Sequence, residues 1–219
     1  MADENHWLAT TRLEALTDGI FAFAMTLLVL SITLPDDPGG NSYMPNAELK
    51  ELLFHEWQRF LNYAIAFLLL ASFWMNHSKA FHMMKATEHR HTWINIIFLM
   101  FVALAPFTTA LVGDYSDDSI AWALFGADIF ILGTFLYLNW WYAWRNPHLL
   151  REGVGMEQIL IGKKRALVVP IVSLISIFIG FAYTGFAGLV YLLMPFVMAL
   201  PYFHVPKGGA DAKGQEIEK

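Results

Sequence analysis

The sequence contains no cysteine among its 219 residues, and charged residues make up only 15% of it. The absence of cysteine excludes disulfide bonds, thiolate metal sites and cysteine nucleophiles. The scarcity of charge argues against a soluble globular domain, in which about a quarter of the residues are charged. Hydrophobic residues account for 57% of the chain and aromatic residues for 16%. This composition is typical of an integral membrane protein.

Long apolar segments divide the chain into membrane spans. A helix needs about 20 mostly apolar residues to cross a hydrocarbon core about 30 Å thick. Backbone groups in lipid must be paired, which leaves helices or a closed barrel, and the continuous apolar runs favour helices. We expect an all-α protein with six spans, over residues 14–34, 56–78, 92–113, 119–144, 165–183 and 186–203. The last two spans are the least certain, because only Tyr183-Thr184-Gly185 joins them.

These spans define a six-helix transmembrane domain over residues 1–205 and a flexible, polar tail over residues 206–219. They also place 12 of the 14 lysine and arginine residues on one side of the membrane. Only Lys50 and Arg59 fall on the other side. Because basic loops stay in the cytoplasm, both termini are expected to be cytoplasmic. The opposite side is rich in acidic residues, namely Asp36, Asp37, Glu48, Glu51, Asp114, Asp117 and Asp118.

Two charges mark the entrance to the first span. Arg12 and Asp18 stand six residues apart, and apolar residues follow Asp18 immediately. One interpretation is anchoring, because an acidic residue near a helix N-terminus complements the helix dipole and arginine extends to the headgroups. The other is a hydrogen-bonded network that joins the first two spans, since Trp74, Asn76 and His77 lie at a comparable depth on the second.

Four residues of the first span are spaced so that they line up along one face of the helix, and we call them the stripe. At 100° per residue the members of this stripe fall within about 60° of one another. Leu27 flanks the stripe, and Asp18 points about 140° away from Phe23. From periodicity alone, an ordinary buried helix face is the favoured interpretation. The stripe consists of Gly19, Phe23, Thr26 and Leu30.

Other polar positions are weaker candidates. Asp128 lies inside the fourth span, where a structural hydrogen bond is favoured over a transport role. Glu88-His89-Arg90-His91 is expected to be a solvated basic loop rather than a metal cluster. His55-Glu56-Trp57-Gln58-Arg59 has arginine where a zinc-protease helix needs its second histidine. A P-loop, a dinucleotide fingerprint and a nucleophile elbow are all missing, so we expect no enzyme, cofactor, bound metal or nucleic-acid partner.

The first span resembles a known motif. Residues Arg12 to Leu30, RLEALTDGIFAFAMTLLVL, are similar to the first-helix signature of bacterial relatives of lysosomal transmembrane protein 175. That signature is R-x-x-x-F-S-D, followed by an apolar helix with a threonine eight residues after the aspartate. Trp74-Met75-Asn76-His77 resembles the Trp/His stretch of the family's second helix, and residues 95–107 resemble its third span. The motifs cover about half of the chain.

The resemblance implies a homotetrameric potassium channel of the bacterial inner membrane, with lipid and monovalent cations as partners. The first helix of each subunit would line a central pore. Phe23, Leu27 and Leu30 would form its narrow apolar part, and Thr26 would form a hydroxyl layer linked to potassium preference. The network that holds the pore helices would consist of Arg12, Thr17, Asp18, Trp74 and His77.

This sequence departs from the family's pattern at three positions. Leu16 replaces phenylalanine and Thr17 replaces serine, and both changes keep the character of the side chain. Phe23 stands where relatives usually place isoleucine or leucine, which changes the width and the wetting of a constriction at this position.

We therefore expect passive conduction of potassium through a hydrophobic constriction without a TVGYG filter. A ring of apolar side chains cannot replace the hydration shell of the ion, so selectivity is expected to be modest. The alternative is a proton-coupled secondary transporter or proton pathway that uses Asp18, His77 and Asp128. A membrane scaffold without transport activity is the third possibility.

Overall fold

A computed structural model describes residues 10–32, 50, 51, 53, 54, 56–182, 188, 190 and 191 of the chain. Within this part, five helices are long and apolar enough to cross a membrane. They are α1 (Thr10–Leu27) with its 3-10 continuation η1 (Leu28–Ser31), α3 (Trp57–His82), α4 (His89–Asp114), α5 (Ser119–Arg145) and α6 (Met156–Ala182). A 3-10 turn, η2 (Pro147–Leu149), follows α5. The expected all-helical fold is confirmed for these five helices.

At the end of the bundle where α1 begins, the helices extend beyond the apolar segments that predicted them, whereas η1 ends at Ser31, before the expected residue 34. The clearest case is α6, which begins at Met156 although its span was expected to start at residue 165. The charges before residue 165 do not end this helix, because lysine and glutamate are good helix formers. Lys163 Nζ also lies 4.2 Å from the centre of the Trp144 ring on α5. Hydropathy marks the hydrocarbon and not the end of a helix. The sixth expected span, 186–203, falls mostly outside the described residues, and the tail, 206–219, falls wholly outside them.

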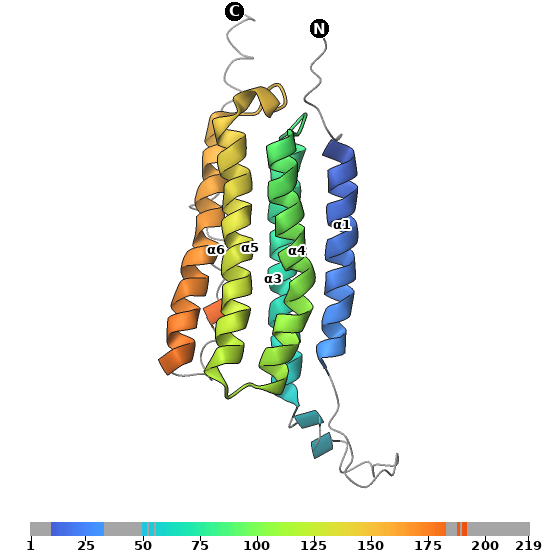
Figure 1. The fold of residues 1–219 in the computed structure, drawn as a ribbon, viewed down its shortest axis with the longest axis vertical. Helices are drawn as coiled ribbons and strands as arrows, with labels where there is room; N and C mark the ends of the chain where they lie inside the picture. The colour runs from blue at the N-terminus through green and yellow to red at the C-terminus, as the bar shows by residue number, and fades with distance from the viewer. Residues whose placement is uncertain are drawn as a thin grey trace, which may run out of the picture.

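The helices stand side by side along the long axis of the molecule (Figure 1). α1 packs against α4 and α3, at the edge of the bundle, while α5 and α6 form the most extensive pair. Small residues allow this close approach: a Cβ on Gly133 of α5 would lie 2.5 Å from Val169 Cγ1 on α6. The position of α1 at the edge leaves one of its faces without a neighbour in the described part of the chain.

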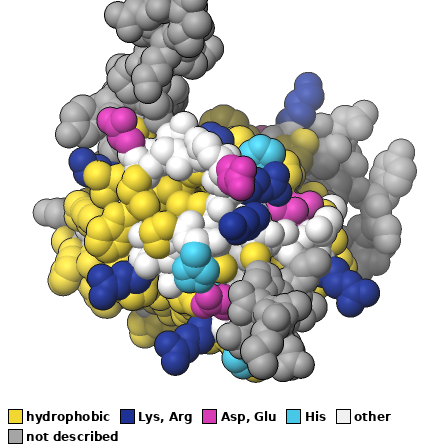
Figure 2. Space-filling model, turned by 90° about the horizontal axis from the view of Figure 1, so that it is seen from above, with side chains coloured by type: hydrophobic (Ala, Val, Ile, Leu, Met, Phe, Trp, Pro, Cys, Tyr) yellow, Lys and Arg dark blue, Asp and Glu magenta, His cyan; other side chains and the backbone are white. Residues whose placement is uncertain are grey.

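Two loops join at the end of the bundle where α1 begins. The backbone N–H of Lys85 donates to Leu149 O at 2.8 Å, and that of Arg151 donates to Met83 O at 2.9 Å. These bonds tie the α3–α4 connection to the α5–α6 connection. Figure 2 shows this end from above, with lysine and arginine side chains spread around its edge. Such a concentration of basic groups is what the predicted topology requires of one membrane face.

Candidate functional site

α1 has a packed face and an open face. The packed face contacts α3 and α4 and consists of Leu13, Thr17, Phe21, Ala24 and Leu28. The stripe predicted from the sequence lies on the open face: Phe23 is 64% exposed and Leu30 is 67% exposed. Gly19 and Thr26 are exposed as well, and Leu27 is half-buried at the border. Within the described part of the chain, the interpretation of the stripe as a buried helix face is therefore wrong.

The hydroxyl of Thr26 has a fixed orientation on this open face. Thr26 Oγ1 donates to Phe23 O at 2.7 Å, so its hydrogen is used within the helix and its lone pairs remain available. After Leu27 the helix tightens into the 3-10 turn η1, which rotates about 120° per residue instead of 100°. The regular helical geometry used to place Leu30 therefore ends before this residue, although Leu30 still lies on the exposed side.

Asp18 and Trp74 connect α1 to α3 at the side of the stripe. Trp74 Nε1 donates to Asp18 Oδ1 at 2.8 Å, and both side chains are exposed. Thr17 instead faces the core, where it is 2% exposed and its hydroxyl donates to Leu13 O at 2.8 Å. Arg12 is exposed at the start of the same helix. The structure thus brings Asp18 and Trp74 together and places Thr17 on another face.

His77, the fifth residue of the predicted network, faces α4. It is 1% exposed, and its Nε2 lies 2.7 Å from Asn95 Oδ1. Its ring stacks between Phe81, at 4.4 Å between ring centres, and Phe98, at 5.3 Å. Phe98 in turn lies 5.9 Å from the ring of Phe21 on the packed face of α1. Phe98 therefore lies between His77 and the packed face of α1.

The sequence interpretation missed two polar residues of this layer, His91 and Asn95. The segment containing His91 was expected to be a solvated loop, but α4 begins at His89 and His91 is fully buried. Asn95 Nδ2 donates to His91 O at 2.8 Å, and the His91 ring stacks on Tyr142 of α5. The signal was present, since two polar residues four positions apart share one helix face. Among the described residues, no group of three or more His, Cys, Asp or Glu side chains could hold a metal ion.

Two further residues link the helices at depth. Asn76 was expected to join the first two spans, but its Oδ1 accepts from Trp140 Nε1 on α5 at 2.9 Å. Asp128 on α5 is 2% exposed, and its Oδ2 accepts from Thr108 Oγ1 on α4 at 3.1 Å. Within the described part of the chain, Asp128 Oδ1 has no hydrogen-bond partner. This geometry is that of the structural hydrogen bond favoured for Asp128.

At the acidic end of the bundle, some of the carboxylates form ion pairs or cap a helix within the fold. Arg59 contacts Glu56 at 2.6 Å and Asp114 at 2.7 Å. Asp118 caps α5, because its Oδ1 accepts from the backbone N–H of Ile120 at 2.8 Å. Two other acidic residues expected at this mouth, Asp36 and Asp37, lie outside the described residues.

The apolar helices and the buried polar contacts between them define an all-helical, multi-pass membrane protein. A family model described as the endosomal/lysosomal potassium channel TMEM175 matches residues 12–106, which contain most of α1, all of α3 and most of α4. The chain is similar to the TMEM175 channels, and the resemblance of its first helix is thereby confirmed. This family consists of ion channels, which are not a class of enzymes.

Three comparisons illustrate the relationship. A potassium channel of Streptomyces collinus is 31% identical over 63% of this chain and 66% of its own length. The human endosomal/lysosomal proton channel TMEM175 is 25% identical over 87% of this chain and 37% of its own length. The aligned region thus spans less than two thirds of either relative. The crystal structure of a lysosomal potassium-selective channel TMEM175 homologue from Chamaesiphon minutus covers 87% of this chain and 98% of its own, with a TM-score of 0.72 at 23% identity.

Proposed function

We propose that the chain is a subunit of a passive, potassium-permeable cation channel, a homotetramer of six-helix subunits in the bacterial inner membrane with both termini in the cytoplasm. The observation that carries this proposal is the open face of α1, where the stripe from Gly19 to Leu30 has no neighbour among the described residues. In a ring of four subunits, four such faces would enclose a pore. The names of the bacterial relatives support potassium as the permeant ion.

The residues on this face suggest how an ion would pass. Phe23 and Leu30 offer large apolar side chains and no ligand, so the ion keeps part of its hydration shell or the pore dewets and closes. Leu27 would complete this apolar part from the border of the stripe. Thr26 adds one oxygen per subunit, because the donated hydrogen leaves its lone pairs free to contact a cation or its water. A single hydroxyl layer between apolar rings predicts modest selectivity.

In the proposed channel, the rest of the subunit must hold α1 and its exposed residues in position. Asp18 and Trp74 would brace α1 from the side, and His77 would support it from behind through Phe98. Thr17 would contribute by packing in the core on the other face of α1, and Arg12 would contribute at the exposed start of the helix. None of these groups needs to touch the ion.

An apolar exposed face has a second explanation, which is contact with lipid, and cysteine labelling separates the two. Because the sequence contains no cysteine, single variants Phe23→Cys, Thr26→Cys and Leu30→Cys can be labelled without background. Matched controls lie on α4, where Met100 and Phe107 are each 59% exposed. A charged, water-soluble thiol reagent reacts with a thiolate in water and not with one in hydrocarbon.

We expect the reagent to block potassium flux into liposomes at the three α1 positions. The variants Met100→Cys and Phe107→Cys should keep their flux after the same treatment. Equal insensitivity at all five positions, in vesicles that conduct potassium, would refute a pore along this face of α1.

A second candidate is proton permeation, which the name of the human relative favours. The buried chain His77–Asn95–His91 and the pair Asp18–Trp74 provide ionisable groups on the packed side and the lateral side of α1. The discriminating measurement is ion flux in liposomes with a potassium gradient, a sodium gradient or a pH gradient applied separately. Flux that requires the pH gradient would favour this candidate over passive potassium conduction.

A further inference from the structure

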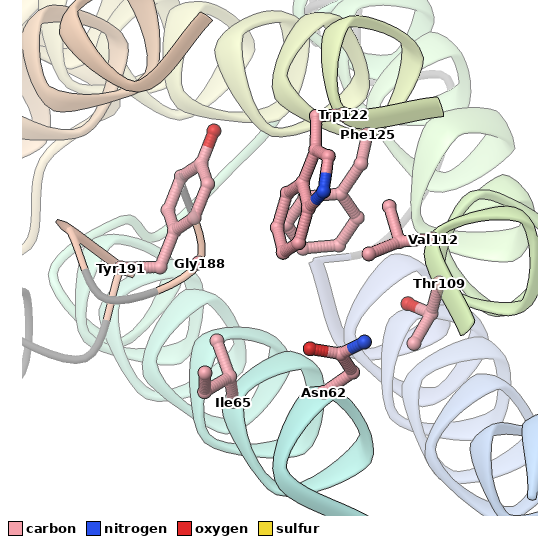
Figure 3. A pocket seen from close by; sticks show the side chains of 8 residues that line it. All are labelled: Asn62, Ile65, Thr109, Val112, Trp122, Phe125, Gly188 and Tyr191. Atoms are coloured by element: carbon pink, nitrogen blue, oxygen red, sulfur yellow. The ribbon is translucent and has the colours of Figure 1, made fainter. Parts of the chain in front are cut away.

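A small cavity lies between α3, α4 and α5, at the acidic end of the bundle. Its volume is about 10 Å³. Its walls are mostly apolar, and the rings of Trp122, Phe125 and Tyr191 form much of them. Two polar side chains also line the cavity, Asn62 from α3 and Thr109 from α4 (Figure 3). Polar groups in such a place need partners, because burial removes them from bulk water.

Both polar groups are incompletely satisfied by the described residues. Asn62 is 8% exposed, and its Nδ2 has no hydrogen-bond partner in the described part of the chain. Thr109 is 2% exposed and donates its hydroxyl hydrogen to Ala105 O at 2.8 Å, which leaves only lone pairs for a second bond. Figure 3 shows the amide nitrogen of Asn62 turned toward the hydroxyl of Thr109, with the hydroxyl of Tyr191 turned away. The cavity therefore presents one donor and one acceptor to whatever occupies it.

We propose that this cavity holds one ordered water molecule that bridges α3 and α4. The water accepts a hydrogen bond from Asn62 Nδ2 and donates one to Thr109 Oγ1. The size agrees, since a site for one water needs about 10–15 Å³, and the cavity has about 10 Å³. A metal cation does not fit, because it requires several oxygen ligands and would meet the amide hydrogens of Asn62. The site serves the packing of the subunit and does not depend on ion conduction.

Two measurements on the full-length, assembled protein test this site. The first is an experimental structure at a resolution where buried waters are visible. We expect a density peak within hydrogen-bond distance of both Asn62 Nδ2 and Thr109 Oγ1, and no such peak in the variant Asn62→Leu. An empty cavity in the unchanged protein, in maps that show other buried waters, would overturn the proposal.

The second measurement is a double-mutant cycle of thermal unfolding with Asn62→Leu and Thr109→Val. If one water joins the two side chains, Thr109→Val lowers the unfolding temperature more in the unchanged protein than in the Asn62→Leu background. The lost bond to Ala105 O is common to both backgrounds and cancels. The control Thr109→Ser keeps the hydroxyl and should keep the coupling to Asn62. Additive effects of the two substitutions would contradict a shared water.

Discussion

Replacing Trp74 by phenylalanine should loosen α1 from α3 and leave ion preference unchanged. The indole N–H donates to Asp18 Oδ1 at 2.8 Å, and phenylalanine keeps most of the ring while removing this donor. Hydrogen bonds to charged groups contribute about 1.5–3 kcal/mol. Trp74 is 39% exposed, so the bond is only partly enclosed by the described residues and the lower end applies. We expect a loss of about 1.5 kcal/mol, roughly a tenfold change in the unfolding equilibrium.

Substitutions at Asp18 provide the other half of the test. Asp18→Asn keeps an oxygen that accepts from Trp74 Nε1 but loses the charge, and charge-assisted bonds are about twice as strong as neutral ones. It should therefore cost about half as much as Asp18→Leu, which removes the acceptor. In the Trp74→Phe background both substitutions at Asp18 should lose most of their effect, because the bond they weaken is already gone.

The assay is thermal unfolding of the purified protein across this cycle, combined with potassium and sodium flux in liposomes. If Asp18→Leu costs as much stability in the Trp74→Phe background as in the unchanged protein, the two side chains do not act together. A changed potassium-to-sodium ratio with an unchanged unfolding temperature would place Asp18 in the permeation path instead. Either result would refute its role as a brace.

Three further changes probe other parts of the subunit. Thr26→Ala should reduce the preference for potassium over sodium with little loss of stability, while Thr26→Ser should keep it, as measured by flux in liposomes. Gly162→Ala should destabilise the protein by about 1–3 kcal/mol, because the new Cβ would lie 2.5 Å from Trp140 Cε3, whereas Gly155→Ala, with its nearest neighbour at 4.0 Å, should be neutral in thermal unfolding. Asp128→Asn keeps an acceptor for Thr108 and should leave both stability and potassium flux nearly unchanged; loss of a pH-driven flux in this variant would assign the carboxyl a transport role.

The sequence predicted the first five helices because their apolar segments match the thickness of the bilayer. It predicted their ends less well, since lysine, arginine and glutamate are good helix formers and a helix can continue past the apolar segment that crosses the hydrocarbon. α6 illustrates this, because it begins at Met156 and includes Lys163 and Lys164 before its apolar part. A count of apolar residues does not contain that information.

The candidate site was also predicted only in part from the sequence. Helical periodicity was sufficient to place Phe23 and Thr26 on one face and Asp18 away from it, since these relations lie within one helix. It could not decide that this face is open, because that depends on which helices pack against α1. Nor could it pair His77 with Asn95 or Asn76 with Trp140, which are contacts between segments far apart in the chain. The spacing of residues predicts which side chains share a helix face, but only tertiary packing determines which other helices contact that face.

The two candidate functions differ in where their paths would run. In the proposed tetramer a cation on the open face of α1 would pass between subunits, because that face has no neighbour among the described residues and other copies would complete it. A proton relayed through His77 and Asn95 would pass within one subunit, on the packed side of α1. Conduction of potassium should therefore require assembly, whereas an internal proton path should not. In vesicles reconstituted from dissociated subunits at fewer than one subunit each on average, potassium flux should disappear, and a pH-driven flux that persists there would show that the proton path belongs to the single chain.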